Sequence, residues 1–204
     1  MVCINPDHFI TYPDGSFAPA PWMQLRQVAT ATVAGKSGNY GVSGGVNKNE
    51  LLHTVTVAYT NDSPVDQLVY GLVTRGGAQV TLQARSRGGL VTYHGVMLGV
   101  GDPPVAEVSR LGVGGDVGRG GILGFGTGFC VLQHSQSETT TWLMPKSAGW
   151  YLLDPGASLT ARVDVRFVSE YWESSAIDGG DQGTESSYIS GDTRVDLFAV
   201  PVIA

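Results

Sequence analysis

The sequence predicts an all-β protein, an antiparallel β-sandwich or jelly roll formed by a single domain. Three observations lead to this fold class: short alternations of apolar and polar residues recur along the chain, glycine occupies 29 of 204 positions, and helical periodicity is almost absent. A period of two is typical of half-buried antiparallel strands, and glycine favours turns over helices. A sandwich of about 200 residues commonly forms one domain.

The clearest predicted strand is Leu159–Phe167, where apolar residues alternate with Thr160, Arg162, Asp164 and Arg166. Asp154-Pro155-Gly156 predicts the turn before it, because proline fixes φ and glycine permits a positive φ. Arg75-Gly76-Gly77-Ala78 is interpreted as a tight hairpin turn. Further strands are expected at 28–34, 51–59, 67–74, 80–84, 90–98, 129–133, 139–143, 150–153 and 195–199.

Three segments differ from this strand pattern. Residues 1–26 contain four prolines and predict an extended N-terminal arm, which leaves 27–204 as the sandwich domain. Residues 99–128 contain eleven glycines, and residues 174–193 are rich in Gly, Ser and Asp. Both are predicted to be long loops, and loops of that length are usually functional or mobile.

Composition argues against several classes of partner. The net charge is −6, and no basic cluster is present to neutralise phosphates, so we expect no nucleic-acid binding. No apolar stretch approaches 18 residues and no signal peptide is recognisable, which predicts synthesis in the cytoplasm without membrane contact. The separation of Cys3 and Cys130 in sequence neither supports nor forbids a disulfide, and free thiols are favoured in that reducing compartment.

Catalytic motifs occur only in incomplete form. Gly41–Gly45 matches the nucleophile-elbow pattern around Ser43, but a strand pattern follows it instead of a helix. Gly35-Lys36-Ser37 lacks the first glycine of a phosphate loop, and Val117 interrupts a dinucleotide pattern after Gly112. We therefore expect no enzyme and no cofactor. A hydrolase that uses Ser43, or Glu170 with Glu173, is the weakest of three functional hypotheses.

Metal ligands are also poorly grouped. The histidines His8, His53, His94 and His134 are widely separated, whereas a zinc site usually takes two ligands from a short spacing. Three acidic residues in the last loop do not have the spacing of a calcium-binding EF-hand; these are Asp178, Asp181 and Glu185. No metal site is expected.

A carbohydrate-binding module is the alternative function. Glu170 and Glu173 flank Tyr171-Trp172 at the end of the clearest strand. Exposed aromatic rings beside carboxylates are suited to sugar contacts, and the candidates are Trp142, Trp150, Tyr171 and Trp172. The same aromatic residues are equally suited to a core or a protein interface.

The order of segments carries a family resemblance. A proline-punctuated arm at 13–22 is followed by a strand opening at Gln27–Thr32, then by residues 150–167 and Trp172-Glu173. This layout resembles the small β-sandwich minor tail proteins of long-tailed phages that infect actinobacteria. The basic residues fit such a GC-rich source, because nine are Arg and three are Lys.

The resemblance implies a structural component of a phage tail or baseplate, often a symmetric ring, and assigns no catalytic residue. The expected location is the virion, and the expected partners are copies of the chain and other virion proteins, with a surface glycan as a further possibility. Extended arms and long loops suit such assembly because they fold on contact with neighbours. The candidate interface residues are Trp22, Ile122, Leu123, Phe125, Phe129, Tyr171 and Trp172.

Overall fold

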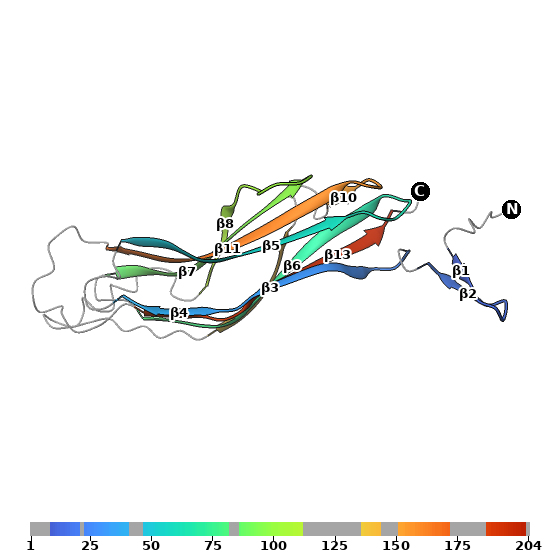
Figure 1. The fold of residues 1–204 in the computed structure, drawn as a ribbon. Coiled ribbons are helices and arrows are strands. Elements are labelled where there is room, and N and C mark those ends of the chain that lie inside the picture. The colour runs from blue at the N-terminus through green and yellow to red at the C-terminus, as the bar shows by residue number, and fades with distance from the viewer. Residues whose placement is uncertain are drawn as a thin grey trace, which may run out of the picture.

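The computed structural model describes residues 9–20, 23–40, 47–81, 86–111, 136–143, 151–171 and 187–202. These residues form thirteen strands, and no α-helix occurs among them. Every strand pair is antiparallel. Figure 1 shows two stacked sheets and a separate hairpin. The predicted fold class, an all-β sandwich, is confirmed.

The larger sheet has seven strands, which occupy four rows. Its rows are β3 (Arg26–Val33) with β4 (Lys36–Asn39), β13 (Thr193–Pro201) with β12 (Ser187–Ser190), β6 (Gln67–Thr81), and β10 (Tyr151–Leu153) with β9 (Gln136–Leu143). Val69 of β6 pairs with both Ala199 and Tyr151, so β13 and β10 lie on opposite edges of β6.

The smaller sheet has four strands in the order β5, β11, β7 and β8. These strands are β5 (Lys48–Thr60), β11 (Ser158–Tyr171), β7 (Ser86–Leu98) and β8 (Ala106–Leu111). Strand β11 contains the whole of the predicted strand Leu159–Phe167. The predicted turn before it is also present, with Gly156 at φ 79° and the Ala157 amide donating to the Asp154 carbonyl at 3.0 Å.

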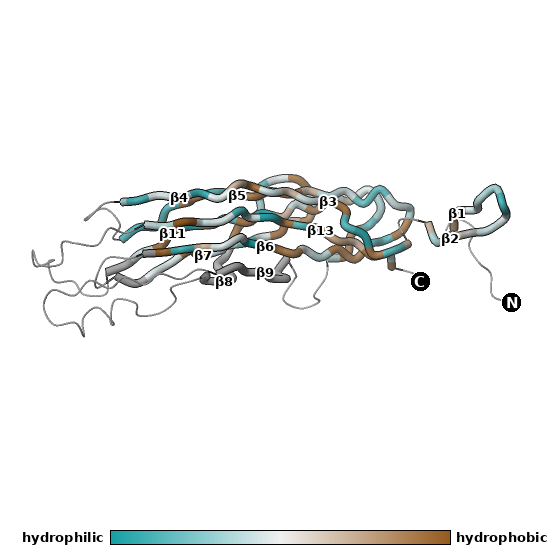
Figure 2. Tube along the Cα trace, turned by 90° about the horizontal axis from the view of Figure 1, so that it is seen from below, coloured by the Kyte–Doolittle hydropathy of each residue, from teal (hydrophilic) through white to brown (hydrophobic). Residues whose placement is uncertain are grey.

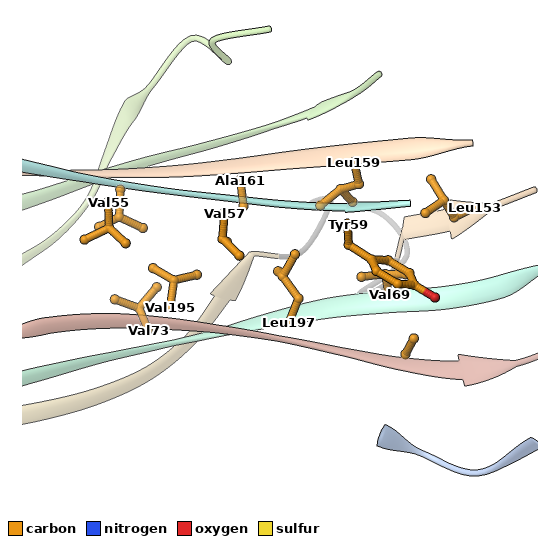
Figure 3. Close-up of a cluster of buried hydrophobic side chains, with 12 residues drawn as sticks. Val55, Val57, Tyr59, Val69, Val73, Leu153, Leu159, Ala161, Val195 and Leu197 are labelled. Atoms are coloured by element: carbon orange, nitrogen blue, oxygen red, sulfur yellow. The ribbon is translucent and has the colours of Figure 1, made fainter. Parts of the chain in front are cut away.

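The core lies between the two sheets and forms two clusters. The larger cluster joins Val55, Val163, Val195 and Leu197, among others. Figure 3 shows Val55, Val195 and Leu197 between the two layers. The smaller cluster contains Phe167 and further buried side chains: Leu52, Ala78, Val80, Leu90, Val165 and Tyr188. The apolar residues of the alternation predicted at Leu159–Phe167 form the side of β11 that faces both clusters.

The prediction of a hairpin turn at residues 75–78 is wrong. Strand β6 runs through Gly76 and Gly77 without a turn. The reason is a close approach between rows, because the backbone of Gly191 lies against Gly76 and the Gly76 amide donates to the Asp192 carbonyl at 2.8 Å. On the far side of Asp192, the Gly35 amide donates to its Oδ1 at 2.9 Å. We call Gly35, Gly76, Gly77 and Gly191 the glycine band.

Strands also occur within the ranges expected to be loops. β8 lies within 99–128, and β12 lies within 174–193. Strand β12 is short, but Tyr188 and Ser190 are buried while Ile189 is exposed, so it alternates as a strand does. The remaining residues of these two ranges, 112–128 and 174–186, lie outside the described part of the chain.

Candidate functional site

The N-terminal arm contains a β-hairpin outside both sheets. Strands β1 (Phe9–Thr11) and β2 (Phe17–Pro19) pair with each other, and no described strand of the sandwich pairs with them. Figures 1 and 2 both place this hairpin beyond the end of the sandwich at which β13 finishes. The sequence predicted an extended arm at 1–26, and the structure adds a formed hairpin within it.

Hydrogen bonds at the turn hold the hairpin in one register. The Tyr12 amide donates to the Ser16 carbonyl at 2.8 Å, and Gly15 takes a φ of 82°. The Asp14 carboxylate accepts from both the hydroxyl and the amide of Ser16, at 2.6 and 2.9 Å. These bonds lower the pKa of Asp14, the hydroxyl having the larger effect. All of these turn hydrogen bonds therefore join residues of the arm itself.

Apolar side chains of the hairpin are exposed. Ile10 is 40% and Tyr12 is 49% exposed. An isolated two-stranded hairpin is at best marginally stable in water, because it buries too little apolar surface. The hairpin therefore gains little stability from apolar burial of its own.

The outer face of the seven-stranded sheet is apolar at the same end. Leu152 pairs with Leu68, Leu68 pairs with Val200, and Leu25 directly precedes Arg26, the partner of Ala199. Two residues further along the same two strands, Tyr70 pairs with Phe198, and their rings stack with centroids 5.2 Å apart. We call this set the outer-face patch: Leu25, Leu68, Tyr70, Leu152, Phe198 and Val200.

A polar network marks the boundary of the outer-face patch. Asp196 lies two residues before Phe198, and its Oδ1 accepts from Gln27 Nε2, Thr30 Oγ1 and Arg194 Nε at 2.7–2.8 Å. Only 4% of Asp196 is exposed. Buried carboxylates need such donors, so this network stabilises the sheet.

The other sheet repeats this arrangement on its outer face. Arg-Val-Asp occurs both at Arg194–Asp196 in β13 and at Arg162–Asp164 in β11. Asp164 accepts from Thr54 Oγ1 at 2.8 Å and from Arg162 Nε at 2.9 Å, and it is 1% exposed. The pairing raises the pKa of Arg162 above its usual value. Both Arg-Val-Asp networks are structural, since their carboxylates are enclosed.

A layer of polar side chains crosses the interior between the two core clusters. His53 Nε2 lies 2.9 Å from Thr193 Oγ1, and the Arg75 guanidinium donates to Thr92 Oγ1 at 2.6 Å. All four residues are buried. Burial lowers the pKa of His53, and the nearby charges of Arg75 and Lys36 lower it further. A His–Thr pair has the groups of a base and a nucleophile, but enclosure between the sheets keeps substrates from it.

His94 provides a pH-dependent contribution to stability. Burial lowers the pKa of His94 from 6.5 to about 4. Between these values the unfolded chain binds a proton at His94 while the folded chain does not, so acidification from pH 6.5 to 4 favours unfolding. Between pH 6.5 and 4, we expect the urea midpoint of His94→Gln, followed by fluorescence, to fall less than that of the unchanged protein. Equal pH slopes for the two proteins would contradict the assignment.

The described residues contain no group of three or more His, Cys, Asp or Glu side chains placed to hold a metal ion. Within the same residues, no helix has the length and apolar character needed to cross a membrane. His53 is 6% exposed in the polar layer, and its Nε2 lies 2.9 Å from Thr193 Oγ1.

Most sequence-predicted site residues lie outside the described residues. Among the interface candidates, Trp22, Ile122, Leu123, Phe125, Phe129 and Trp172 fall there, and Tyr171 is described only as the last backbone position of β11. The same holds for the hydrolase and sugar-binding candidates: Ser43, Trp150 and Glu173 fall outside, while Glu170 and Trp142 are described by their backbone alone. Cys3, Cys130, Asp178, Asp181 and Glu185 are also outside.

The structure reveals a surface that the sequence interpretation missed, the outer-face patch. A signal for it existed in the sequence. Residues 68–73 are apolar without alternation, and so are residues 197–203. A strand that is apolar on both faces is usually buried on both faces.

No protein-family model and no curated protein matches the sequence. Solved structures with some likeness are those of infectious bursal disease virus. The Gx strain has 12% identity and a TM-score of 0.32 over 96% of this chain and 42% of that chain. The T=1 particles derived from infectious bursal virus have 13% identity and a TM-score of 0.28 over 100% and 41% of the two chains.

The VP2 subviral particle of the same virus has 14% identity and a TM-score of 0.27, covering 100% of this chain and 42% of that chain. This chain therefore spans about two fifths of the length of these viral particle proteins. Matches at these identities and TM-scores do not identify a function for this chain.

Proposed function

We propose that this chain is a structural component of a phage virion, a minor tail or baseplate protein that acts through protein–protein assembly. The observation that carries the proposal is the hairpin β1–β2, which stands outside the sandwich with Ile10 and Tyr12 exposed. The resemblance in segment order to minor tail proteins supports the same role. The partners are copies of this chain and other virion structural proteins.

The physical argument concerns the cost of ordering the arm. Each ordered residue loses about 1–2 kcal/mol of backbone conformational entropy, and a hairpin of this size buries little apolar surface of its own. Contact with a neighbouring subunit supplies the missing burial. The proposed interface candidates would extend that contact; they are Trp22, Ile122, Leu123, Phe125, Phe129, Tyr171 and Trp172.

Light scattering of the purified chain over a concentration series tests the assembly role. We expect a closed oligomer, for example of three or six copies, and we expect removal of residues 1–19 to weaken self-association by at least tenfold in concentration. Tenfold corresponds to about 1.4 kcal/mol, less than the burial of one large apolar side chain contributes. A strict monomer at every concentration would contradict the proposal.

Antibody labelling tests the location. Antibodies raised against the purified chain should label the tail of purified virions of the encoding phage in electron micrographs, and a digest of those virions should contain its peptides. Head labelling would retain a virion role but reject the tail assignment. Absence of the chain from the particles, with abundant chain in the lysate, would reject both.

A further inference from the structure

The outer-face patch is unusual for the solvent side of a sandwich. The outward side of an antiparallel sheet is normally polar. The Arg-Val-Asp networks on both sheets follow this rule, with Asp164 at the centre of one and Asp196 at the centre of the other. Beyond Asp196, the seven-stranded sheet instead has apolar residues at two successive outward pairing positions of β6 and β13. Leu25 and Leu152, at the margins of these pairs, are 56% and 51% exposed.

From these observations we infer that the outer-face patch of one copy receives the hairpin β1–β2 of a second copy. The inference rests on the proposed assembly function and names the surface through which assembly occurs. In the complex, Ile10 and Tyr12 of one chain pack against Leu25, Leu152 and the Tyr70–Phe198 ring pair of the other.

Continuity along the chain identifies the occupant. Leu25, at one margin of the outer-face patch, is separated from the end of β2 by only five residues, 20–24. The hairpin therefore leaves the sandwich at the end that carries the outer-face patch. Figures 1 and 2 show the hairpin extended away from its own sandwich.

Chemical matching supports the same occupant. Both surfaces carry exposed apolar side chains, Ile10 and Tyr12 on the hairpin and Leu25 and Leu152 on the patch. Each copy offers one hairpin and one patch, which are different surfaces. A contact between different surfaces is heterologous, and it forms a ring when the rotation between copies closes. Reciprocal exchange between two copies satisfies the two surfaces equally.

Three exposed positions test the inference by light scattering. Leu25→Glu and Leu152→Glu place a charge in the outer-face patch without disturbing the core, and we expect each to weaken self-association by at least tenfold. Ile189→Glu is the matched control, because Ile189 is also 51% exposed and lies in the same sheet, in β12 beyond the glycine band. The control should assemble like the unchanged protein, and circular dichroism should show that all three variants fold.

A photo-crosslinker at position 12 tests the occupant directly. With the chain prepared in light and heavy isotopic forms and mixed, we expect crosslinks from position 12 to peptides containing residues 68–72, 151–153 or 196–202 of the other isotopic form. Crosslinks confined to the same isotopic form would mean that the hairpin folds back on its own chain, and would overturn the inference.

The two levels of the hypothesis fail in different ways. If the chain assembles, loses assembly on removal of residues 1–19, and is unaffected by Leu25→Glu and Leu152→Glu, then the inference is wrong and the assembly role stands. If the unchanged chain is monomeric at every concentration, the assembly role fails and the inference fails with it.

Discussion

Replacement of Phe167 by alanine should lower the free energy of unfolding by about 3–5 kcal/mol, the loss typical of a large aromatic side chain in a protein core. Phe167 is fully buried in the smaller core cluster. Its ring centroid lies 4.9 Å from that of Tyr40 and 5.5 Å from that of Tyr188. Removal of the ring therefore leaves a cavity and breaks two aromatic contacts.

Urea unfolding followed by circular dichroism measures this loss. A domain of this size changes its melting temperature by about 2–4 °C per kcal/mol, so thermal unfolding should shift by roughly 6–20 °C. Phe198→Ala, compared at a concentration at which the chain is monomeric, is a matched control, because it removes the same atoms from a half-buried ring on the outer face. We expect its effect to be less than half as large, and equal losses would contradict the assigned core.

The alternation in β11 made the sandwich predictable from sequence. One side of this strand, from Leu159 to Phe167, is buried, and the other carries Arg162 and Arg166. A period of two reports directly which side chains face a core. The pattern is local, so no knowledge of the partner strands was needed to predict it.

The path of β6 was not predictable in the same way. Gly76-Gly77 has the composition of a turn, yet both residues lie in a continuous strand. The requirement for Gly76 comes from Gly191, which is distant in sequence and adjacent only after the rows have paired. Local turn statistics contain no information about such a contact.

The candidate site was predictable only in kind. The proline-rich arm was expected to contact neighbours, and the structure places exposed apolar residues in its hairpin. The outer-face patch was missed because the apolar run at 68–73 was interpreted only as a strand. Pairing of Tyr70 with Phe198 brings two such strands side by side, and this pairing turns two apolar runs into a patch.

Substitution in the glycine band should have the second large effect. Gly191→Ala should lower the free energy of unfolding by about 1–3 kcal/mol, the usual cost of overpacking an interior. An added Cβ at this position would lie 2.6 Å from the Gly76 carbonyl carbon and 2.7 Å from the Gly77 carbonyl oxygen. These are backbone atoms of the neighbouring strand, so relief requires β12 and β6 to move apart.

Gly77→Ala provides the control within the same band. Nothing lies within 4 Å of a Cβ added at Gly77, and its φ is not positive. Alanine there should be neutral or should stabilise the protein by up to about 1 kcal/mol, since it restricts the unfolded chain. The shifts in urea midpoint of the two single variants, relative to the unchanged protein, should therefore have opposite signs or very different sizes. Similar losses at both positions would mean that the band needs glycine for backbone freedom and not for the close approach of β12 to β6.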